Sequence, residues 1–188
     1  MEVVERSTGL GLTLVSGPSR SGKSRWAEHL VAGRGKPVLY VATGALAADD
    51  PAWQRRLQLH RQRRPGHWAT WEVEGQLEAA LGRAPADHQL LIDSLGTWLA
   101  HHLDLDAESW EQRQLGLLEA LRTCAAPQVL VTEETGWGVV PATAVGGRFR
   151  DRLGALQQRL QPLAQASWLV IQGRALDLHA LSQPVPEL

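Results

Sequence analysis

Residues 17–24 read Gly17-Pro18-Ser19-Arg20-Ser21-Gly22-Lys23-Ser24, and they directly follow a short apolar run, residues 12–16. The eight residues match the pattern G-x-x-x-x-G-K-[ST], in which a glycine-rich loop joins a strand to a helix. Backbone N–H groups of such a loop point toward a phosphate chain, and the helix adds its positive N-terminal end. Lys23 can reach the outer phosphates, and Ser24 can ligate Mg²⁺. The stretch predicts a nucleoside triphosphate site, with a chance glycine turn as the alternative.

Short apolar runs recur outside this stretch and alternate with longer segments of helical spacing. The runs cover residues 12–16, 38–43, 89–93, 129–132 and 168–172, with a sixth short one at 68–73. The helical segments cover residues 23–33, 51–64, 75–83, 95–125 with a break near Asp104, and 146–165. This alternation predicts an α/β fold, a P-loop NTPase with a mostly parallel sheet and helices on both faces.

The composition limits the class of protein. With 188 residues, the chain is expected to form a single domain, 1–188, with loosely held tails at 1–11 and 179–188. A hydrophobic content of 44% and a net charge of −1 exclude a disordered acidic tail and a globally basic nucleic-acid binder. The single cysteine, Cys124, excludes an intrachain disulfide. No signal peptide or transmembrane stretch is evident, so we expect a cytoplasmic protein.

A second acidic residue is expected near the phosphates, at the end of a neighbouring strand. The run Leu90-Leu91-Ile92-Asp93 supplies one, and Asp93 would help to hold Mg²⁺, partly through water. The alternative role for Asp93 is to cap the helix that starts near Leu95. Ser94 could do that capping alone, so the two roles do not exclude each other.

The segment 51–64 is a helix with clear ends and a strong positive charge. Asp50 is a candidate N-cap, Pro51 suits the first helical position, and Pro65-Gly66 ends the helix. Five arginines and no acid fall within ten residues: Arg55, Arg56, Arg61, Arg63 and Arg64. In a chain of near-zero net charge, this excess favours an anionic ligand. A solvated helix face is the alternative, and nucleic-acid binding has little support.

His60 lies in the same helix, on one face with Trp53 and Leu57. Taken alone, it reads as a structural histidine with a satisfied hydrogen bond. Beside arginines that could orient a triphosphate, a neutral imidazole could instead attack the α-phosphorus and carry a nucleotidyl group.

Six ordered blocks carry a family resemblance: SGKSRWAE at 21–28, VLYVAT at 38–43, HRQRRPGHWATWE at 60–72, DSLGTWL at 93–99, VTEETGWGVVP at 131–141 and RFRDRLGALQQ at 148–158. Together they resemble the bifunctional adenosylcobinamide kinase and adenosylcobinamide-phosphate guanylyltransferase family of cobalamin biosynthesis. The similarity runs in order from about residue 12 to about residue 178.

The resemblance implies a RecA-like P-loop fold, a homotrimer and two activities. One phosphorylates adenosylcobinamide with GTP or ATP, and the other transfers GMP from GTP to adenosylcobinamide phosphate through a guanylylated His60. The corrinoid and the nucleotides are then substrates, Mg²⁺ is the cofactor and no nucleic acid is bound. The implied GTP contacts are Gly17, Pro18, Ser19, Arg20, Ser21, Gly22, Lys23 and Ser24 in the loop, then Ala42, Thr43, Gly44, Arg61, Gln62, Arg63, Arg64, Glu72 and Asp93.

The chain departs from the family pattern at several positions. Glu133 and Thr135 replace the usual Asn and Val, His101 and Gln157 replace two usual Asn residues, and Gln165 replaces an Asp. We expect these positions to lie away from the phosphate loop and His60, and to affect corrinoid contacts, trimer details or the kinase half. His67, His101 and His102 lack the spacing of a metal site and read as surface or structural residues.

Two other functions compete with this reading. The first is a simpler P-loop small-molecule kinase that uses the arginine helix as a lid and forms no covalent intermediate. The second is a nucleotide-gated regulatory module, which would bind nucleotide without turning over cobinamide.

Overall fold

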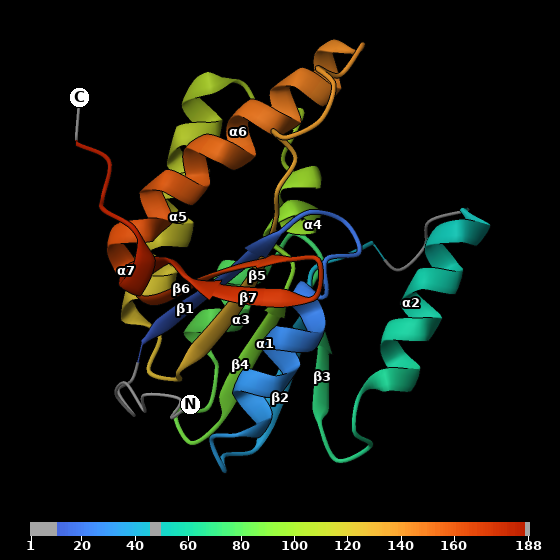
Figure 1. The fold of residues 1–188 in the computed structure, drawn as a ribbon, viewed down its shortest axis with the longest axis vertical. Helices are drawn as coiled ribbons and strands as arrows, with labels where there is room; N and C mark the ends of the chain where they lie inside the picture. Colours follow the sequence, from blue (N-terminus) through green and yellow to red (C-terminus); the bar gives the residue numbers. More distant parts are fainter. Residues whose placement is uncertain (1–10, 46–49, 187–188) are drawn as a thin grey trace.

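The computed structural model describes residues 11–45 and 50–186, and these build one seven-stranded sheet (Figure 1). Its strands are β1 (Leu12–Gly17), β2 (Val38–Ala42), β3 (Ala69–Glu72), β4 (Gln89–Asp93), β5 (Gln128–Glu133), β6 (Ala164–Ile171) and β7 (Arg174–Asp177). Their order is β3-β2-β4-β5-β1-β6-β7. Only the β6–β7 pair of this sheet is antiparallel. The predicted α/β fold with a mostly parallel sheet is confirmed.

Helices cover both faces of this sheet, as predicted. They are α1 (Lys23–Ala32), α2 (Pro51–Arg63), α3 (Leu77–Gly82), α4 (Leu95–Ala100), α5 (Ala107–Thr123), α6 (Ala144–Leu160), the 3-10 turn η1 (Gln161–Leu163) and α7 (Leu178–Leu181). Residues of α3, α4, α5 and α6 share one hydrophobic core with one face of the strands. Residues of α1 share a second core with the opposite face. Because alternate residues of a strand point to opposite faces, Leu14 joins the first core and Val15 the second.

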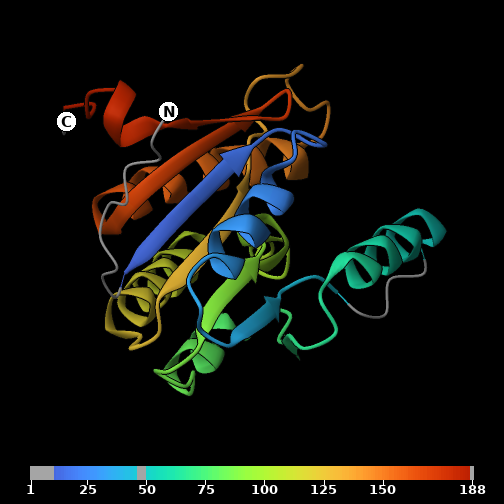
Figure 2. The same cartoon turned by 60° about the horizontal axis from the view of Figure 1, so that its bottom comes forward.

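Helix α2 lies apart from the other helices. It begins at Pro51 and ends just before Pro65-Gly66, as its sequence predicted. Figures 1 and 2 both show it to one side of the sheet, beyond the edge that β2 and β3 form. The arginine-rich helix α2 therefore lies on the side of the sheet that β2 and β3 form.

The sequence predicted the boundary of one other helical segment correctly and that of another incorrectly. The expected break near Asp104 is confirmed, because α4 ends at Ala100 and Asp106 caps α5 by accepting a hydrogen bond from the N–H of Ser109 at 2.8 Å. The segment predicted as a helix to residue 165 stops at Leu160. Pro162 has no N–H to continue the helix, and the chain enters β6 at Ala164, four residues before the predicted strand.

Strand β7 is the one strand among the described residues that the sequence did not predict. It returns along β6 through a two-residue turn, Gln172-Gly173, whose φ values are 52° and 75°. Positive φ at both turn positions is typical of a tight hairpin. Asp177 then caps α7, so residues 178–181 are helical although a loose tail was expected from residue 179. The expected N-terminal tail lies almost wholly outside the described residues.

The carboxyl ends of four parallel strands meet at one edge of the sheet. These ends are Gly17 of β1, Ala42 of β2, Asp93 of β4 and Glu133 of β5. Ligands of open α/β sheets bind outside this kind of edge. The sequence-predicted phosphate loop and Asp93 both lie there.

Within residues 11–45 and 50–186, no helix is both long enough and apolar enough to cross a membrane.

Candidate functional site

The phosphate loop, residues 17–24, joins the end of β1 to the start of α1. Gly22 has a φ of 102°, a backbone conformation that glycine adopts at little cost. A Cβ at Gly17 would lie 2.3 Å from the carbonyl oxygen of Val170, so a side chain has no room there. Among the described residues, no side chain caps α1, and its first turn contains no acid. The positive end of α1 is therefore open to an anion.

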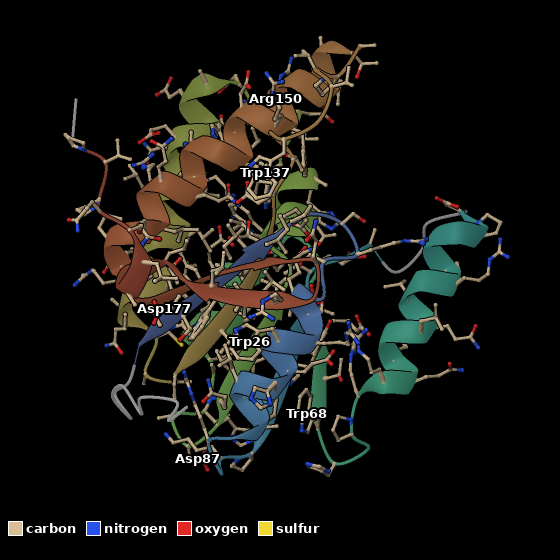
Figure 3. All side chains as sticks on the ribbon, in the orientation of Figure 1. Trp26, Trp68, Asp87, Trp137, Arg150 and Asp177 are labelled. Atoms are coloured by element: carbon tan, nitrogen blue, oxygen red, sulfur yellow. The ribbon has the colours of Figure 1, made fainter. Side chains whose placement is uncertain are left out.

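The loop is held from outside by the β6–β7 hairpin. The N–H of Gly173 in the hairpin turn donates a hydrogen bond of 3.0 Å to the carbonyl of Ser21. Below the loop, Trp26 of α1 packs edge-on against Trp168 of β6, with ring centroids 5.1 Å apart (Figure 3 labels Trp26). These contacts fix the loop and the helix that follows it on the sheet.

Lys23 is buried at the first position of α1, with only 5% of its surface exposed. Its Nζ donates a hydrogen bond of 3.3 Å to the carbonyl of Pro18, across the loop. The ε-amino group of Lys23 is therefore held against the backbone of the phosphate loop.

Asp93 ends β4, and β5 separates it from β1. Its Oδ2 accepts a hydrogen bond of 2.7 Å from the hydroxyl of Tyr40. Burial, and then the charge of Asp93, raises the pKa of Tyr40 well above its ordinary value, so the phenol stays a donor. Ser94 caps α4, since its side chain accepts from the N–H of Thr97, so the helix does not need Asp93 as its cap.

The segment after β2, residues 42–44, supports the start of α4. Thr43 is fully buried. Its Oγ1 donates to the carbonyl of Ser94 at 2.6 Å and accepts from the N–H of Ser94 at 2.8 Å. The side chain of Thr43 thus fastens the residue next to Asp93, and contact between residues 42–44 and a nucleotide stays a prediction.

Three of the predicted arginines, all near the end of α2, join α2 to the sheet and to α1. Arg61 pairs with Glu72, which ends β3, at 3.2 Å. Arg63 pairs with Glu28 of α1 at 2.7 Å, and its guanidinium contacts both oxygens of that carboxylate. The first pair brings Arg61 and the predicted Glu72 together at the β3 edge, the second holds Arg63 against α1, and the predicted Gln62 is exposed.

Arg64 has a different environment from the other two. Its guanidinium lies 3.4 Å from the ring centroid of Tyr40, the residue that donates to Asp93. Its Nε is buried and has no hydrogen-bond partner in the part of the chain that the structure describes. A buried, unpaired guanidinium donor favours an anionic partner, so Arg64 fits the predicted phosphate contact best of the three.

The predicted nucleophile, His60, lies in the last turns of α2, but its side chain is outside the described part of the structure. The same holds for Arg56 and Trp53. The role of His60 therefore stays a prediction.

Glu133 corrects one expectation. We expected this departure from the family pattern to lie away from the phosphate loop, but Glu133 ends β5 directly beside Gly17, its register partner in β1. Its Oε2 accepts a hydrogen bond of 2.9 Å from the N–H of Gly96, and its Oε1 accepts one from the hydroxyl of Ser94. Burial raises the pKa of the Glu133 carboxyl, and the hydrogen bond from Ser94 partly offsets that effect.

Two more departures lie at the same edge. Gln157 of α6 donates to Oγ1 of Thr132 at 2.9 Å and to the carbonyl of Glu133 at 3.1 Å. The Nε2 of His101 lies 3.0 Å from the carbonyl of Thr43. Gln165 lies instead at the start of β6, against Gly11 and away from the loop, as expected. Glu133 and Gln157 lie at this edge because β5 is between β4 and β1, and His101 lies there because it contacts the end of β2.

Sequence reasoning missed two residues that shape this edge, Tyr40 and Glu133. Each gives a weak signal in the sequence, since each has a hydrogen-bonding side chain at or near the end of a strongly apolar run. The runs alone do not say which strands become neighbours, so the link from Tyr40 to Asp93 and from Glu133 to α4 could not be drawn.

The described histidines make no metal site. His102 is buried, its Nε2 lies 3.2 Å from the carbonyl of Gly75, and burial lowers its pKa. His67 is exposed after α2. Over residues 11–45 and 50–186, no group of three His, Cys, Asp or Glu side chains is placed to bind a metal ion.

Comparison with known proteins gives matches over most of the chain. Residues 13–178 match the sequence model of the family described as cobinamide kinase / cobinamide phosphate guanyltransferase. The bifunctional adenosylcobalamin biosynthesis protein CobU of Salmonella typhimurium is 36% identical over 177 residues, covering 86% of this chain and 96% of that protein. The bifunctional adenosylcobalamin biosynthesis protein CobP of Pseudomonas aeruginosa is 38% identical over 167 residues, covering 88% and 95%.

A solved structure from Pyrococcus horikoshii, described as Project ID PH0250, has a TM-score of 0.50 at 6% identity and covers 89% of this chain and 85% of its own. At that identity the likeness concerns the fold alone, which agrees with the α/β arrangement of a mostly parallel sheet. The family match extends over the phosphate loop, the arginine helix and the Asp93 strand. The chain therefore belongs to the cobinamide kinase / cobinamide phosphate guanyltransferase family of enzymes.

Proposed function

We propose that this enzyme phosphorylates adenosylcobinamide with GTP or ATP and then transfers GMP from GTP to the new phosphate, through a guanylylated His60. The observation that carries the proposal is the meeting of a phosphate loop with Lys23, the carboxylate of Asp93 and Arg64 at one sheet edge, in a chain of this family. The relatives CobU and CobP are described as bifunctional.

In the kinase step, the hydroxyl oxygen of adenosylcobinamide forms a bond to the γ-phosphorus while the bond to the β-phosphate oxygen breaks. The nucleoside diphosphate leaves, and the hydroxyl proton is released. Lys23 and the loop N–H groups stabilise the negative charge that moves onto the leaving diphosphate. This step needs no covalent bond between the enzyme and the nucleotide.

In the guanylyl step, an imidazole nitrogen of His60 attacks the α-phosphorus of GTP and pyrophosphate leaves. A phosphate oxygen of adenosylcobinamide phosphate then attacks the same phosphorus, the bond to His60 breaks, and adenosylcobinamide-GDP is released. Arg61 and Arg64 would align the triphosphate for in-line displacement. The buried Nε of Arg64, which lacks a partner among the described residues, supports its part in this alignment.

The chemistry of the donor set fits Mg²⁺. Ser24 offers a hydroxyl at the start of α1 and Asp93 a carboxylate at the end of β4, and Mg²⁺ prefers such oxygen ligands with several waters retained. These two residues would hold the ion, which when bound neutralises phosphate charge.

The proposal is tested by following the label from α-³²P-GTP. We expect the enzyme to acquire a label that is stable to base and labile to acid, as a phosphoramidate on histidine is. His60→Ala should lose this label, whereas the control His67→Ala, at an exposed position, should keep it. A label that persisted in His60→Ala would rule out His60 as the nucleophile.

Product masses separate the competing functions. Incubation with GTP, Mg²⁺ and adenosylcobinamide should give adenosylcobinamide-GDP and pyrophosphate. Adenosylcobinamide phosphate as the final product, with no labelled enzyme, would indicate a simple P-loop kinase. Nucleotide binding without any corrinoid product would indicate a regulatory module.

A further inference from the structure

The carboxylate of Glu133 touches the start of α4 with both of its oxygens. One oxygen accepts from the Ser94 hydroxyl, and the other accepts from the N–H of Gly96 at 2.9 Å. A Cβ at Gly96 would lie 2.3 Å from Oε2 of Glu133, so the absence of a side chain at residue 96 is what allows this approach. Glu133 and Gly96 therefore form a matched pair between β5 and α4.

The joint between Asp93 and Ser94 is fastened from both neighbouring strands. From β2, Thr43 bonds to the N–H and the carbonyl of Ser94. From β5, Glu133 bonds to the side chain of Ser94 and to Gly96. Without Glu133, the Ser94 hydroxyl and the Gly96 N–H would lose their bonds to β5, so the turn after Asp93 would keep its side-chain bonds to β2, while Asp93 would stay paired with Val131 in the sheet.

The charge of Glu133 also bears on the phosphate edge. The groups that face it are the carboxylate of Asp93 from β4, Lys23 from α1, and the two donors from α4. A bound triphosphate adds several negative charges next to these groups. A carboxylate at this position repels a triphosphate that has no bound cation. The repulsion is weaker when a divalent cation has neutralised part of the phosphate charge.

We propose that Glu133 is a positioning residue that fixes Asp93 at the phosphate edge and makes triphosphate binding depend more strongly on a divalent cation than a neutral side chain would. The proposal rests on the function proposed above, because it assigns Glu133 to the same triphosphate site.

The test compares Glu133→Gln, which keeps the size of the side chain but removes its charge, with Glu119→Gln, which removes an exposed charge on α5. GTP affinity is measured by isothermal titration in Mg²⁺ and in EDTA, and thermal unfolding is measured beside it. For Glu133→Gln we expect affinity in EDTA to rise about threefold and the gain from Mg²⁺ to shrink by a similar factor. We also expect the kcat of Glu133→Gln to fall by a larger factor than the change in its KM for GTP, because Asp93 is held less firmly in this variant. Glu119→Gln should match the parent, and an unchanged ratio of affinities in Glu133→Gln would overturn the proposal.

Gly96→Ala perturbs the same contact from the other side. Alone, it should lower kcat because the new methyl group displaces the Glu133 carboxylate. Combined with Glu133→Ala, it should cost little more than Glu133→Ala alone, because the carboxylate it would displace is gone. Additive losses in the double variant would contradict a role through the Glu133–Gly96 contact.

Failure of this proposal can be told from failure of the proposed function. If the parent forms the guanylylated enzyme but Glu133→Gln keeps the parental dependence on Mg²⁺, only the role of Glu133 is wrong. If the affinities shift as expected but no labelled enzyme forms, the role of Glu133 stands and the guanylyl step is wrong.

Discussion

Lys23 and Lys36 are the two lysines of the chain, and their surroundings differ sharply. Lys23 is buried and bonds to Pro18 across the phosphate loop, whereas Lys36 is exposed before β2. We expect Lys23→Met, which keeps most of the buried stem, to weaken GTP binding about tenfold to 100-fold, because a charged donor to phosphate is lost. Both half-reactions should slow.

Isothermal titration with GTP and assays of the two half-reactions measure this effect. Lys36→Met is the matched control and should bind GTP like the parent. Equal affinities in the two variants would remove Lys23 from the triphosphate site.

His102 predicts a pH dependence of stability. Burial, and then the charge of Arg113, lowers the pKa of His102, so the unfolded chain takes up a proton that the folded protein rejects. The free energy of unfolding should therefore fall as the pH drops below about 6.5, the ordinary histidine value, with a slope of up to about 1.4 kcal/mol per pH unit from this residue.

Urea unfolding between pH 5 and pH 8 measures that slope. His102→Gln should reduce it, and His67→Gln, at an exposed position, should not. If His102→Gln kept the full slope, another group would be responsible for it.

The residues of the candidate site show what residue identity alone can predict. The motif around Lys23 and the acid at the end of an apolar run were both found because each carries its own local pattern. Glu133 was misplaced because its position relative to Gly17 depends on the order of the strands, which no local pattern encodes.

At the scale of elements, the hydroxyl of Thr43 contributes to the joint between β2 and α4. Thr43→Val would keep the shape of the side chain but leave the buried N–H of Ser94 without its bond to Oγ1. We expect the free energy of unfolding to fall by about 1–3 kcal/mol. Thr70→Val, at an exposed position of β3, should change it by less than about 0.5 kcal/mol.

Urea unfolding of the two variants measures the difference. A loss in Thr43→Val no larger than that in Thr70→Val would show that the hydroxyl bonds do not hold the joint. GTP affinity measured on the same variants tests separately whether Thr43 matters to nucleotide binding.

The boundaries of elements were predictable where a punctuating residue marks them. Pro51 and Pro65 mark the two ends of α2 as expected, and Asp106 caps the start of α5 after the break. Helix α6 was predicted too long because Pro162 was not weighed as its stop. Strand β7 was missed because four residues are too few to show a period, although Gln172-Gly173 supplied a turn signal.

At the scale of the whole molecule, we expect a homotrimer, with a native mass of about three times 20.6 kDa. The loop between β5 and α6 exposes Trp137 (labelled in Figure 3), Val139 and Val140, which gives such an assembly apolar area to bury. Light scattering on a size-exclusion column measures the mass.

Val139→Asp, at a position that is 94% exposed, should lower that mass if this loop lies in the interface. If Val139→Asp remained a trimer, the interface would not depend on this loop. If the parent protein were a monomer, the expected trimer would be wrong.

The class of fold was predictable from alternation and the phosphate loop, but the sheet order was not. Helical spacing and apolar runs are local, whereas pairing β1 with β5 and β6 joins segments more than a hundred residues apart. The cytoplasmic location stays a prediction.

The place of β1 between β5 and β6 sets an order of events during synthesis. The phosphate loop lies near the N-terminus, yet the strands that flank it and the Gly173 turn that bonds to Ser21 come from the last third of the chain. A nascent chain that has emerged only as far as β4 has the whole nucleotide motif but neither neighbour of β1. The residues through the β6–β7 hairpin must therefore leave the ribosome before the phosphate loop can reach its folded arrangement, and fragments that end at β4 should bind chaperones rather than nucleotide.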